Sequence, residues 1–416
     1  MPEVIVVGSG IIGVSSAVWL QRMGADVTLV DRIGPASGAS FGNAGVLASC
    51  AIVPVTTPGL IKKAPGMLFH PESPLFLKWS YLPIIAPWLL RFLSHANFDD
   101  ASRIANALSS LISDSLPQHQ ELASGSVSET LIIPMDYWYL YPNKADFEAD
   151  SFGWQLRATN GFEWDHFDLD KIYNEDPALK GLSKGYAISI GNHGRIINPE
   201  NYVKGLVSLF VEKGGKLLRG DTRRIAVNKS GTVSPVIDGK TFACSSLVLA
   251  GGAWSGSLLR GLGVRIPMNT ERGYHIEIWN PNLMPIRSMM ITAHKAVMTP
   301  MNNRLRLAGI VEFGGLRLGP SRKPLRLLRK CLNEILPDIK YDSITEWLGF
   351  RPTVSDSLPV IGPVSDFKNL YVAFGHHHIG LTAGAKTGKL VSELVIGKSP
   401  SADVDVFSPD RFIYRQ

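Results

Sequence analysis

Cysteine is scarce in this chain of 416 residues: Cys50, Cys244 and Cys331 are the only three, and no two of them form a C-x-x-C pair. Thiols so few and so far apart predict neither a disulfide framework nor a zinc site, and we expect no bound metal. They also favour a reducing compartment, so we expect a cytoplasmic protein.

Charged residues are scarce as well, at 19% of the chain against roughly 25% in an average soluble protein. Lys and Arg number 42 and Asp and Glu 36, which gives a formal net charge of +6 without a polybasic run. We therefore expect no nucleic-acid partner, while small anionic ligands and an anionic membrane surface fit this charge equally well. The 45% of hydrophobic residues exclude a disordered chain, and the length predicts about two or three domains.

Long uninterrupted hydrophobic runs are also missing. The uncharged stretch 4–20 contains three glycines and follows no Lys or Arg, which disfavours a signal peptide or a membrane span. A second apolar stretch, YLPIIAPWLLRFL, contains Pro83 and Pro87 and is too short to cross a bilayer. Patterns that declare a catalytic base, such as Ser–His–Asp, HExxH or paired carboxylates, are absent too.

The N-terminal segment EVIVVGSGIIGVSSAVWLQRMGADVTLVDR brackets a helical stretch with two β-branched runs, which predicts a βαβ unit. Its turn has the spacing G-x-G-x-x-G, in which the glycines permit a tight turn, close approach of backbone amides to a pyrophosphate, and close helix–strand packing. An acidic residue ends the second strand, where a carboxylate accepts hydrogen bonds from a ribose. The pattern predicts a dinucleotide site, without deciding which dinucleotide, at Gly8, Gly10, Ile11, Ile12, Gly13, Asp31 and Arg32.

Later segments predict more α/β structure. A helix at 201–213 precedes the strand-like KLLRGDTRRIAV and SSLVLAGGAW, and strands recur between 274 and 313. A helix with basic residues follows at 324–336, and LYVAFGHHHIGLTAGAKTGKLVSELVIG predicts a strand, a glycine-rich turn and a helix. No internal repeat is visible.

Four motifs in chain order carry a resemblance to a known family: SGASFGNAG, LVLAGGAWS, GFRPTVSDSLPVIG and AFGHHHIGLTAGAKTG. Together they resemble the D-amino acid oxidase type of FAD-dependent oxidoreductases over the whole chain. Within that family the resemblance is to the bacterial D-amino acid dehydrogenase small subunit, with glycine oxidase, sarcosine oxidase and D-hydroxyproline dehydrogenase as relatives.

The resemblance implies an α/β fold of two domains. A Rossmann-like FAD-binding domain would gather residues 1–52, 195–266 and 349–416. A mainly antiparallel-sheet α+β substrate domain would consist of residues 53–194 and 267–348.

The resemblance also implies further residues that hold FAD. Small residues after the first unit would let the backbone lie against the isoalloxazine and ribityl chain, and the N-terminus of the last helix would face the flavin pyrimidine edge. Thr222 stands where the family presents backbone to adenine, in place of the usual apolar residue. The implied contacts are Ser40, Asn43, Ala44, Gly45, Val46, Thr222, Ala250, Gly251, Trp254, Gly375, Gly380, Leu381 and Thr382.

Three positions are expected to act on the substrate. A guanidinium matches a carboxylate bidentately, and the family uses the arginine of GFRP, here Arg351, for that role. Tyr274 would donate its hydroxyl to the carboxylate or cap the pocket, with a plain sheet aromatic as the alternative. Side chains at 376–378 alternate in direction on an extended segment, which disfavours a three-histidine metal site. We expect His376 or His378 to face the substrate, with a polar filler role as the alternative.

The implied activity is FAD-dependent oxidative deamination of a D-amino acid, neutral and apolar or of the D-proline type, by hydride transfer to the flavin. The product imino acid would hydrolyse to a 2-oxo acid and ammonia. Rival readings are a glycine- or sarcosine-type amine oxidase that produces hydrogen peroxide, a nicotinamide-dependent dehydrogenase, and a non-catalytic flavin-binding subunit of a larger complex.

The electrons are expected to pass to a quinone or another respiratory-chain acceptor. The stretch 75–93 mixes Trp and Tyr with Lys and Arg, which suits peripheral contact with the inner face of the cell membrane. A helix packed under the substrate domain and an interface with another subunit are the alternatives.

Overall fold

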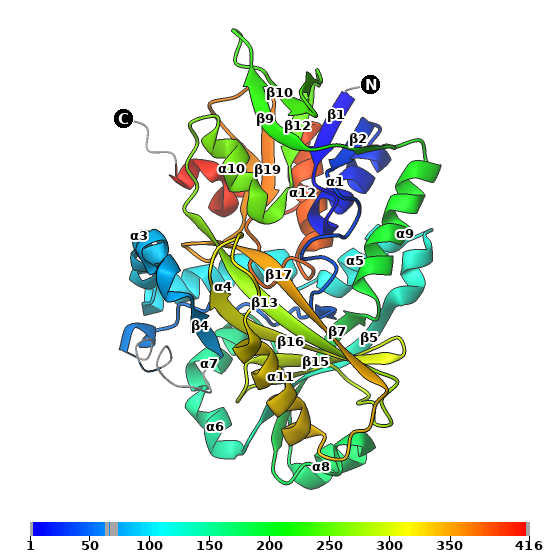
Figure 1. Ribbon diagram of the computed structural model, residues 1–416, viewed down its shortest axis with the longest axis vertical. Coiled ribbons are helices and arrows are strands. Elements are labelled where there is room, and N and C mark those ends of the chain that lie inside the picture. The colour runs from blue at the N-terminus through cyan, green and yellow to red at the C-terminus, as the bar shows by residue number, and fades with distance from the viewer. Residues whose placement is uncertain (1–2, 63–65, 67–73, 413–416) are drawn as a thin grey trace.

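The computed structural model describes residues 3–62, 66 and 74–412. Figure 1 shows two layers, with one sheet and its helices above and a larger sheet below. The upper sheet has six strands. The helices are α1 (Ile11–Arg22), α3 (Leu82–Ser94), α4 (Phe98–Ile112), α5 (Ser115–Ala123), α6 (Lys144–Ala149), α7 (Ser151–Thr159), α8 (Leu169–Glu175), α9 (Pro199–Glu212), α10 (Ser255–Arg260), α11 (Arg322–Ile335) and α12 (Gly384–Val395).

The upper sheet has the strand order β18-β19-β12-β1-β2-β8, and every neighbouring pair except β18–β19 is parallel. Its strands are β1 (Glu3–Val7), β2 (Asp26–Asp31), β8 (Lys216–Arg219), β12 (Ser246–Leu249), β18 (Val360–Pro363) and β19 (Leu370–Phe374). A small antiparallel sheet of β9 (Thr222–Val227), β10 (Val233–Ile237) and β11 (Lys240–Thr241) follows β8. The central strands β1 and β12 are almost entirely buried on both faces, which explains their continuous apolar sequence.

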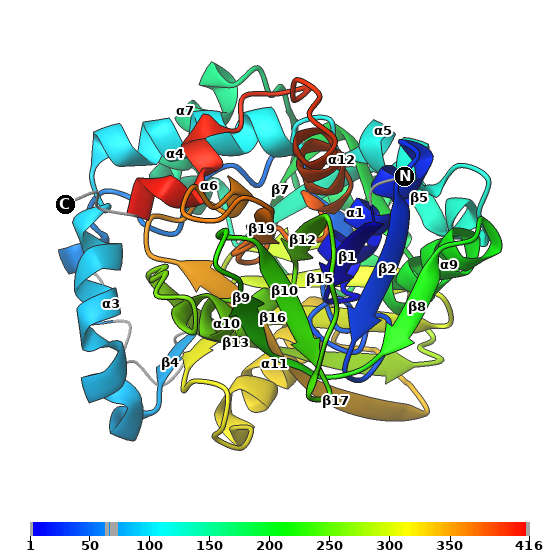
Figure 2. The same ribbon diagram turned by 90° about the horizontal axis from the view of Figure 1, so that it is seen from above.

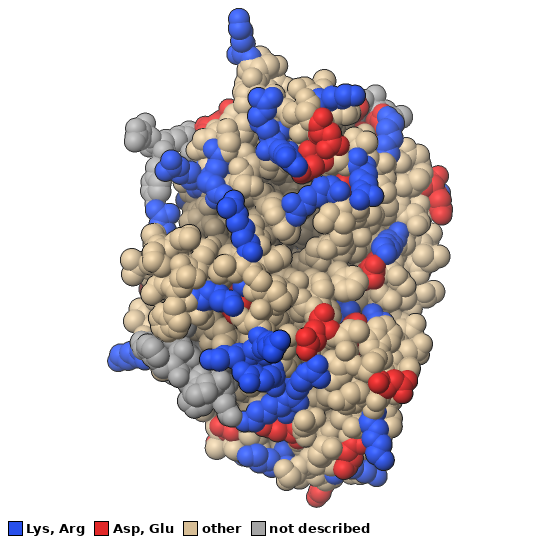
Figure 3. Space-filling model, in the orientation of Figure 1, with Lys and Arg blue, Asp and Glu red and all other residues tan. Residues whose placement is uncertain are grey.

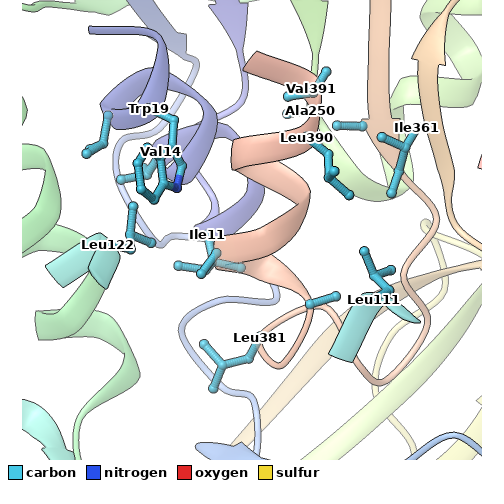
Figure 4. Close-up of a cluster of buried hydrophobic side chains, with 14 of the residues drawn as sticks. Ile11, Val14, Trp19, Leu111, Leu122, Ala250, Ile361, Leu381, Leu390 and Val391 are labelled. Atoms are coloured by element: carbon cyan, nitrogen blue, oxygen red, sulfur yellow. The ribbon is translucent and has the colours of Figure 1, made fainter. Parts of the chain in front are cut away.

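Helices α1 and α12 pack side by side on the upper sheet (Figure 2). The close approach depends on a glycine, because a Cβ atom at Gly388 would lie 2.5 Å from the Cβ of Ser15. Figure 4 shows the apolar cluster around these helices, in which Leu111 of α4 and Leu122 of α5 join Ile11 and Leu390. Since α4 and α5 lie in sequence between two strands of the lower sheet, this cluster fixes the upper layer against the lower one.

The lower sheet has the order β17-β13-β16-β15-β14-β5-β7-β3, with β4 added beside β16 and β6 beside β7. Its strands are β3 (Val46–Leu47), β4 (Leu75–Leu77), β5 (Ile132–Tyr141), β6 (Asp165–Phe167), β7 (Tyr186–Ile196), β13 (Met268–Trp279), β14 (Met289–Ile291), β15 (Ala296–Met301), β16 (Arg304–Phe313) and β17 (Ser343–Val354). Only the β14–β5 and β16–β4 pairs are parallel. The buried face of α11 covers this sheet with Leu327, Leu328, Cys331 and Leu332.

The predicted fold class, a Rossmann-like layer with a mainly antiparallel second layer, is confirmed. The domain boundaries stay a prediction, and two details bear on them. The predicted boundary at 349 lies inside β17, and β3, placed by the sequence in the cofactor domain, pairs with β7 of the lower sheet.

The stretch 75–93 folds as β4, a 3-10 turn (Trp79–Tyr81) and α3, in which Pro83 occupies the first turn and Pro87 lies inside the helix. In the part of the chain that the structure describes, no helix has the length and apolar character needed to cross a bilayer.

Candidate functional site

A cavity of about 1110 Å³ lies between the two layers. Its walls come from the β1–α1 turn, the loop after β2, the ends of β12 and β19, and the facing side of the lower sheet. Pockets for single small molecules occupy roughly 300–1,000 Å³, so this cavity has room for a dinucleotide together with a small substrate.

The glycine turn at one end has the tight geometry that the sequence predicts. Gly8 has a φ of 107°, and a Cβ atom there would lie 2.5 Å from the carbonyl oxygen of Ala250. A Cβ at Gly13 would lie 1.8 Å from the carbonyl oxygen of Gly8. Side chains are excluded from this turn by backbone on both sides, and its open face lines the cavity, so the residues present fit the pyrophosphate of a dinucleotide.

Asp31 organises the loop around this end. Its carboxylate accepts hydrogen bonds from the backbone N–H groups of Ser9 at 2.8 Å, Ile33 at 2.9 Å and Gly34 at 3.0 Å. The next residue, Arg32, stacks over Trp254 with 4.3 Å between its Cζ and the ring centroid. Both of these side chains line the cavity, at the end where the sequence places the adenosine half.

The loop at 40–46 is held by its own side chains. Ser40 Oγ accepts a hydrogen bond from the N–H of Ile11 at the start of α1, at 2.9 Å. Asn43 Nδ2 donates to the carbonyl of Ser40 at 2.9 Å, and Asn43 Oδ1 accepts from the N–H of Gly45 at 2.8 Å. Gly45 takes a φ of 72° where a Cβ would lie 2.7 Å from the carbonyl oxygen of Ile196.

A buried ion pair ties this loop to the lower sheet. Arg306 Nη1 donates to the carbonyl oxygens of Asn43 at 2.6 Å and Phe41 at 3.3 Å, while its Nη2 donates to Glu277 Oε1 at 2.6 Å. Arg304 Nε donates to the same Glu277 oxygen at 2.6 Å. Burial alone would raise the pKa of Glu277, but the two arginines lower it. Sequence reasoning missed this group, because only the pairing of β13 with β16 brings its members together.

Arg351 lines the other end of the cavity, where its guanidinium is held by neutral acceptors. Nη1 donates to the carbonyl of Ile310 at 3.1 Å and Nη2 to that of Gly309 at 3.2 Å. No ion pair to Arg351 occurs within the described residues. Ile310 has a φ of 59°, which is a true outlier for a β-branched residue, next to a shift in the β13–β16 register. The irregular strand thus presents carbonyls that orient a half-buried guanidinium, which has no ion-pair partner in the described residues.

Two ionisable groups flank Arg351 in the cavity wall. Glu271 is its cross-strand partner, and burial raises the pKa of Glu271 while Arg351 opposes that rise. The His378 side chain is exposed to the open cavity, where desolvation by the walls and the nearby Arg351 lower its pKa to about 4, so this imidazole is neutral at pH 7. Glu271 was not predicted from the sequence as a site residue. The available signal was its position two residues before Gly273, which places both residues on the same face of an extended segment.

The remaining predicted substrate residues have partners in the fold. Tyr274 lines the cavity, but its hydroxyl donates to Glu312 at 2.6 Å and accepts from the N–H of Ser321 at 2.9 Å. His376 Nε2 lies 3.0 Å from the hydroxyl of Thr387, and His377 Nε2 accepts from the N–H of Val354 at 3.1 Å. Within the described ranges, no cluster of His, Cys, Asp and Glu is arranged to hold a metal ion.

The cavity brings most of the predicted cofactor residues together. Gly13, Gly45 and Gly375 lie behind its wall, and a Cβ at Gly375 would lie 2.6 Å from Val354 Cγ2. The predicted cofactor residues that line it are Gly8, Gly10, Ile11, Ile12, Asp31, Arg32, Ser40, Asn43, Ala44, Val46, Thr222, Ala250, Gly251, Trp254, Gly380, Leu381 and Thr382.

Comparison with known proteins gives consistent matches over the whole chain. Residues 3–394 match the family described as FAD dependent oxidoreductase. A D-amino-acid oxidase of Bradyrhizobium diazoefficiens is 36% identical over 424 residues, 99% of this chain and 100% of that protein. A D-amino acid dehydrogenase of Rhizobium johnstonii is 28% identical, over 96% of this chain and 97% of that one. The crystal structure of glycine oxidase from Geobacillus kaustophilus shares the fold, with a TM-score of 0.75 at 20% identity over 99% of both chains.

Proposed function

The chain belongs to the FAD dependent oxidoreductase family that its four motifs predict, and from that premise we propose that it oxidises D-amino acids to imino acids, which hydrolyse to 2-oxo acids and ammonia. FAD is its cofactor, and it supplies the redox chemistry by accepting the hydride from the substrate Cα. The observation that carries the proposal is Arg351, a half-buried guanidinium that faces the cavity and has no ion pair to a carboxylate in the described residues.

Each wall residue near Arg351 has a distinct task in this proposal. The substrate carboxylate binds the guanidinium, because a half-buried cation held only by carbonyls gains a charge-assisted hydrogen bond from an anion. The substrate amine faces Glu271, the carboxyl group directly across the strand pair from Arg351. His378 stays neutral beside the guanidinium and donates or accepts a hydrogen bond without adding charge. Closure of the cavity around these groups keeps water from the reacting atoms.

We further propose that neutral, apolar or D-proline-type substrates are preferred. The support is the apolar wall next to Arg351, formed by Leu77, Val311 and Phe313. A small hydrophobic side chain gains burial there at roughly 25 cal/mol per Å².

An anaerobic titration tests the activity. The purified yellow protein is mixed with paired D- and L-amino acids, D-proline, hydroxy-D-proline, glycine and sarcosine, and loss of the oxidised flavin absorbance is followed. Bleaching by D-enantiomers supports the proposal. A fully loaded protein that none of them bleaches would contradict it and favour a non-catalytic flavin-binding subunit.

The electron acceptor defines a second candidate, an oxidase that reduces oxygen to peroxide. The 36% identical relative is named D-amino-acid oxidase, and the glycine oxidase fold match points the same way. We propose the dehydrogenase, with a quinone or other respiratory acceptor, and the discriminating measurement is peroxide yield per substrate oxidised in air. A stoichiometric yield contradicts the dehydrogenase reading.

Contact with a membrane surface belongs to the same proposal. α3 exposes Ile84 at 67% and Leu90 at 72%, while Leu89 and Phe92 of the same helix line the cavity. Figure 3 shows Lys and Arg side chains gathered over α11 on the face seen in Figure 1, which suits anionic headgroups. The test is flotation with vesicles of anionic or neutral lipid. The double variant Ile84→Ser, Leu90→Ser is expected to abolish binding. If as much of this variant as of the unchanged protein floats with anionic vesicles, the contact is refuted.

A further inference from the structure

A second guanidinium, this one buried, lines the same cavity at the end formed by β5 and α7. Arg157, 5% exposed, donates from Nε to the carbonyl of Cys50 at 3.1 Å and from Nη2 to the hydroxyl of Tyr139 at 3.0 Å. Its Cζ lies 4.7 Å from the ring centroid of Tyr139 and 4.6 Å from that of Trp154. These contacts fix the side chain, as expected of a binding group that is organised in advance.

Arg157 has no carboxylate at ion-pair distance in the described chain, although, against the lowering effect of burial, Asp150 is near enough to raise the pKa of the guanidinium. Its Nη1 donates no hydrogen bond to the described residues. The acid beside it, Asp150, accepts from the hydroxyl of Tyr141 at 2.7 Å. Gly153 leaves open the space that borders both Arg157 Nη1 and Asp150 Oδ1, since a Cβ there would lie 3.5 Å from the nitrogen and 3.4 Å from the oxygen.

A second donor faces the same space. Tyr137 is only 2% exposed, lines the cavity, and its hydroxyl has no hydrogen-bond partner among the described residues. A buried hydroxyl without a partner costs free energy that a bound acceptor restores. Arg157 and Tyr137 therefore offer a charged donor and a neutral donor to one ligand group.

This end is separate from the one occupied by Arg351. The guanidinium of Arg351 contacts carbonyls of β16. In the sheet, β15 and β14 lie between β16 and β5, the strand that carries Tyr137 and Tyr139, so three inter-strand spacings separate the two ends. At about 4.8 Å per step, the two ends are roughly 14 Å apart. The α-carboxylate of an amino acid bound at Arg351 is therefore too distant to satisfy Arg157 as well.

We propose that Arg157 and Tyr137 form a second anion subsite, which binds a carboxylate in the same cavity as the amino acid held by Arg351. The subsite rests on the proposed function for the identity of that amino acid. The carboxylate comes from the distal end of an extended substrate or from a separate small acid, and the two sources differ in their kinetics.

The test uses the FAD-loaded protein and three variants. Arg157→Met removes the charge, Tyr137→Phe removes only the hydroxyl, and Gly153→Ala fills the space at ordinary contact distances of 3.4 and 3.5 Å from Asp150 and Arg157. Gln155→Met, on an exposed position of the same helix, is the control. Gly153→Ala and Tyr137→Phe keep the assay informative if loss of Arg157 prevents folding.

Two arms identify the source. In the first, kcat/KM is measured for D-amino acids of increasing length that end in a carboxylate or in the matching carboxamide. In the second, acetate, succinate and glutarate are titrated into the enzyme at a fixed concentration of a short neutral D-substrate, and flavin absorbance and KM are followed.

A preference of about tenfold or more for one carboxylate length assigns the subsite to a substrate tail, whereas saturable effects of added acid assign it to a separate ligand. In either case the three variants lose the effect, Gln155→Met keeps it, and oxidation of the short neutral substrate continues. If neither arm shows an effect that the variants remove, the subsite is refuted, even where the short neutral substrate is oxidised. If no substrate is oxidised at all, the proposed function fails separately, and the spectral titration with added acid still decides the subsite.

Discussion

The guanidinium of Arg351 lies against the backbone of Gly273, so closely that a Cβ atom at residue 273 would be 2.4 Å from Cζ of the arginine. Arg351 is the cross-strand partner of Glu271. Its side chain starts on β17 and crosses β13 at Gly273 to reach β16. The absence of a side chain at 273 is thus what lets the arginine reach the carbonyls of β16.

Gly273→Ala should therefore displace the Arg351 guanidinium while leaving the distant glycine turn intact. We expect KM for the D-amino acid to rise about 10- to 100-fold, since a charge-assisted contact is weakened, with FAD content unchanged. Steady-state kinetics and the flavin-to-protein absorbance ratio measure both. Gly319→Ala, an exposed glycine with open space around it, is the control, and an unchanged KM in Gly273→Ala would show that Arg351 does not hold the substrate.

The Glu277 carboxylate is shared by Arg304 and Arg306. Replacing the glutamate and replacing one arginine should therefore have different effects on stability and on FAD binding. Glu277→Gln leaves Arg304 and Arg306 buried and facing one another, and we expect it to cost about 3–5 kcal/mol of unfolding free energy. Arg306→Gln leaves the Arg304–Glu277 pair intact and should cost less stability. It should instead weaken FAD binding, because the carbonyls of Phe41 and Asn43 lose their donor.

Urea denaturation and FAD titration of the apoprotein separate the two effects. Arg329→Gln, at a half-exposed ion pair with Glu346, is the control for loss of an arginine. If Glu277→Gln and Arg306→Gln lower the free energy of unfolding equally, the Glu277 carboxylate does not stabilise both arginines as proposed.

Glu271 should lower stability at neutral pH. Burial raises its pKa in the folded state, so between the unfolded value of about 4.3 and that raised value the folded protein binds more protons, and stability falls as pH rises. Glu271→Gln removes this term and should raise the free energy of unfolding at pH 7–8 by on the order of 1 kcal/mol, and the melting temperature with it. Because the substrate amine loses its partner, KM should rise about tenfold. Differential scanning calorimetry from pH 4 to 8 checks the sign, and a variant that is less stable than wild type at pH 8 contradicts it.

Buried histidines should make the protein sensitive to mild acid. Burial lowers the pKa of His119 to about 4 and that of His376 to about 3. Their unfolded pKa is about 6.5, so the stability they contribute is fully present above that pH and is lost progressively as pH falls from 6.5 towards 3–4.

The check is the slope of unfolding free energy against pH between 6.5 and 4.5, above the range of ordinary carboxylates. His376→Asn should remove about one proton from that slope, whereas exposed His166→Asn should leave it unchanged. A slope that does not respond to His376→Asn would mean that this imidazole is protonated in the folded state.

The sequence by itself determined the dinucleotide turn and the family. Gly13 is dictated locally, because its Cβ would meet the carbonyl of Gly8 in the same turn, and Gly8 is dictated by its own positive φ. The loop at 40–46 is held by its own Ser40 and Asn43. The same local logic placed Arg351, through the motif in which it stands.

Only the tertiary structure decided what surrounds those residues. Glu271, Arg157 and the Arg306–Glu277 pair come from strands and a helix far apart in the chain, and sequence periodicity does not specify which strand lies beside which. Tyr274 shows the same limit: its place on a strand was predicted, but its engagement with Glu312 depends on the pairing of β13 with β16. Charge and burial at a site are properties of the assembled sheet, and they become defined only when its long-range pairs have formed.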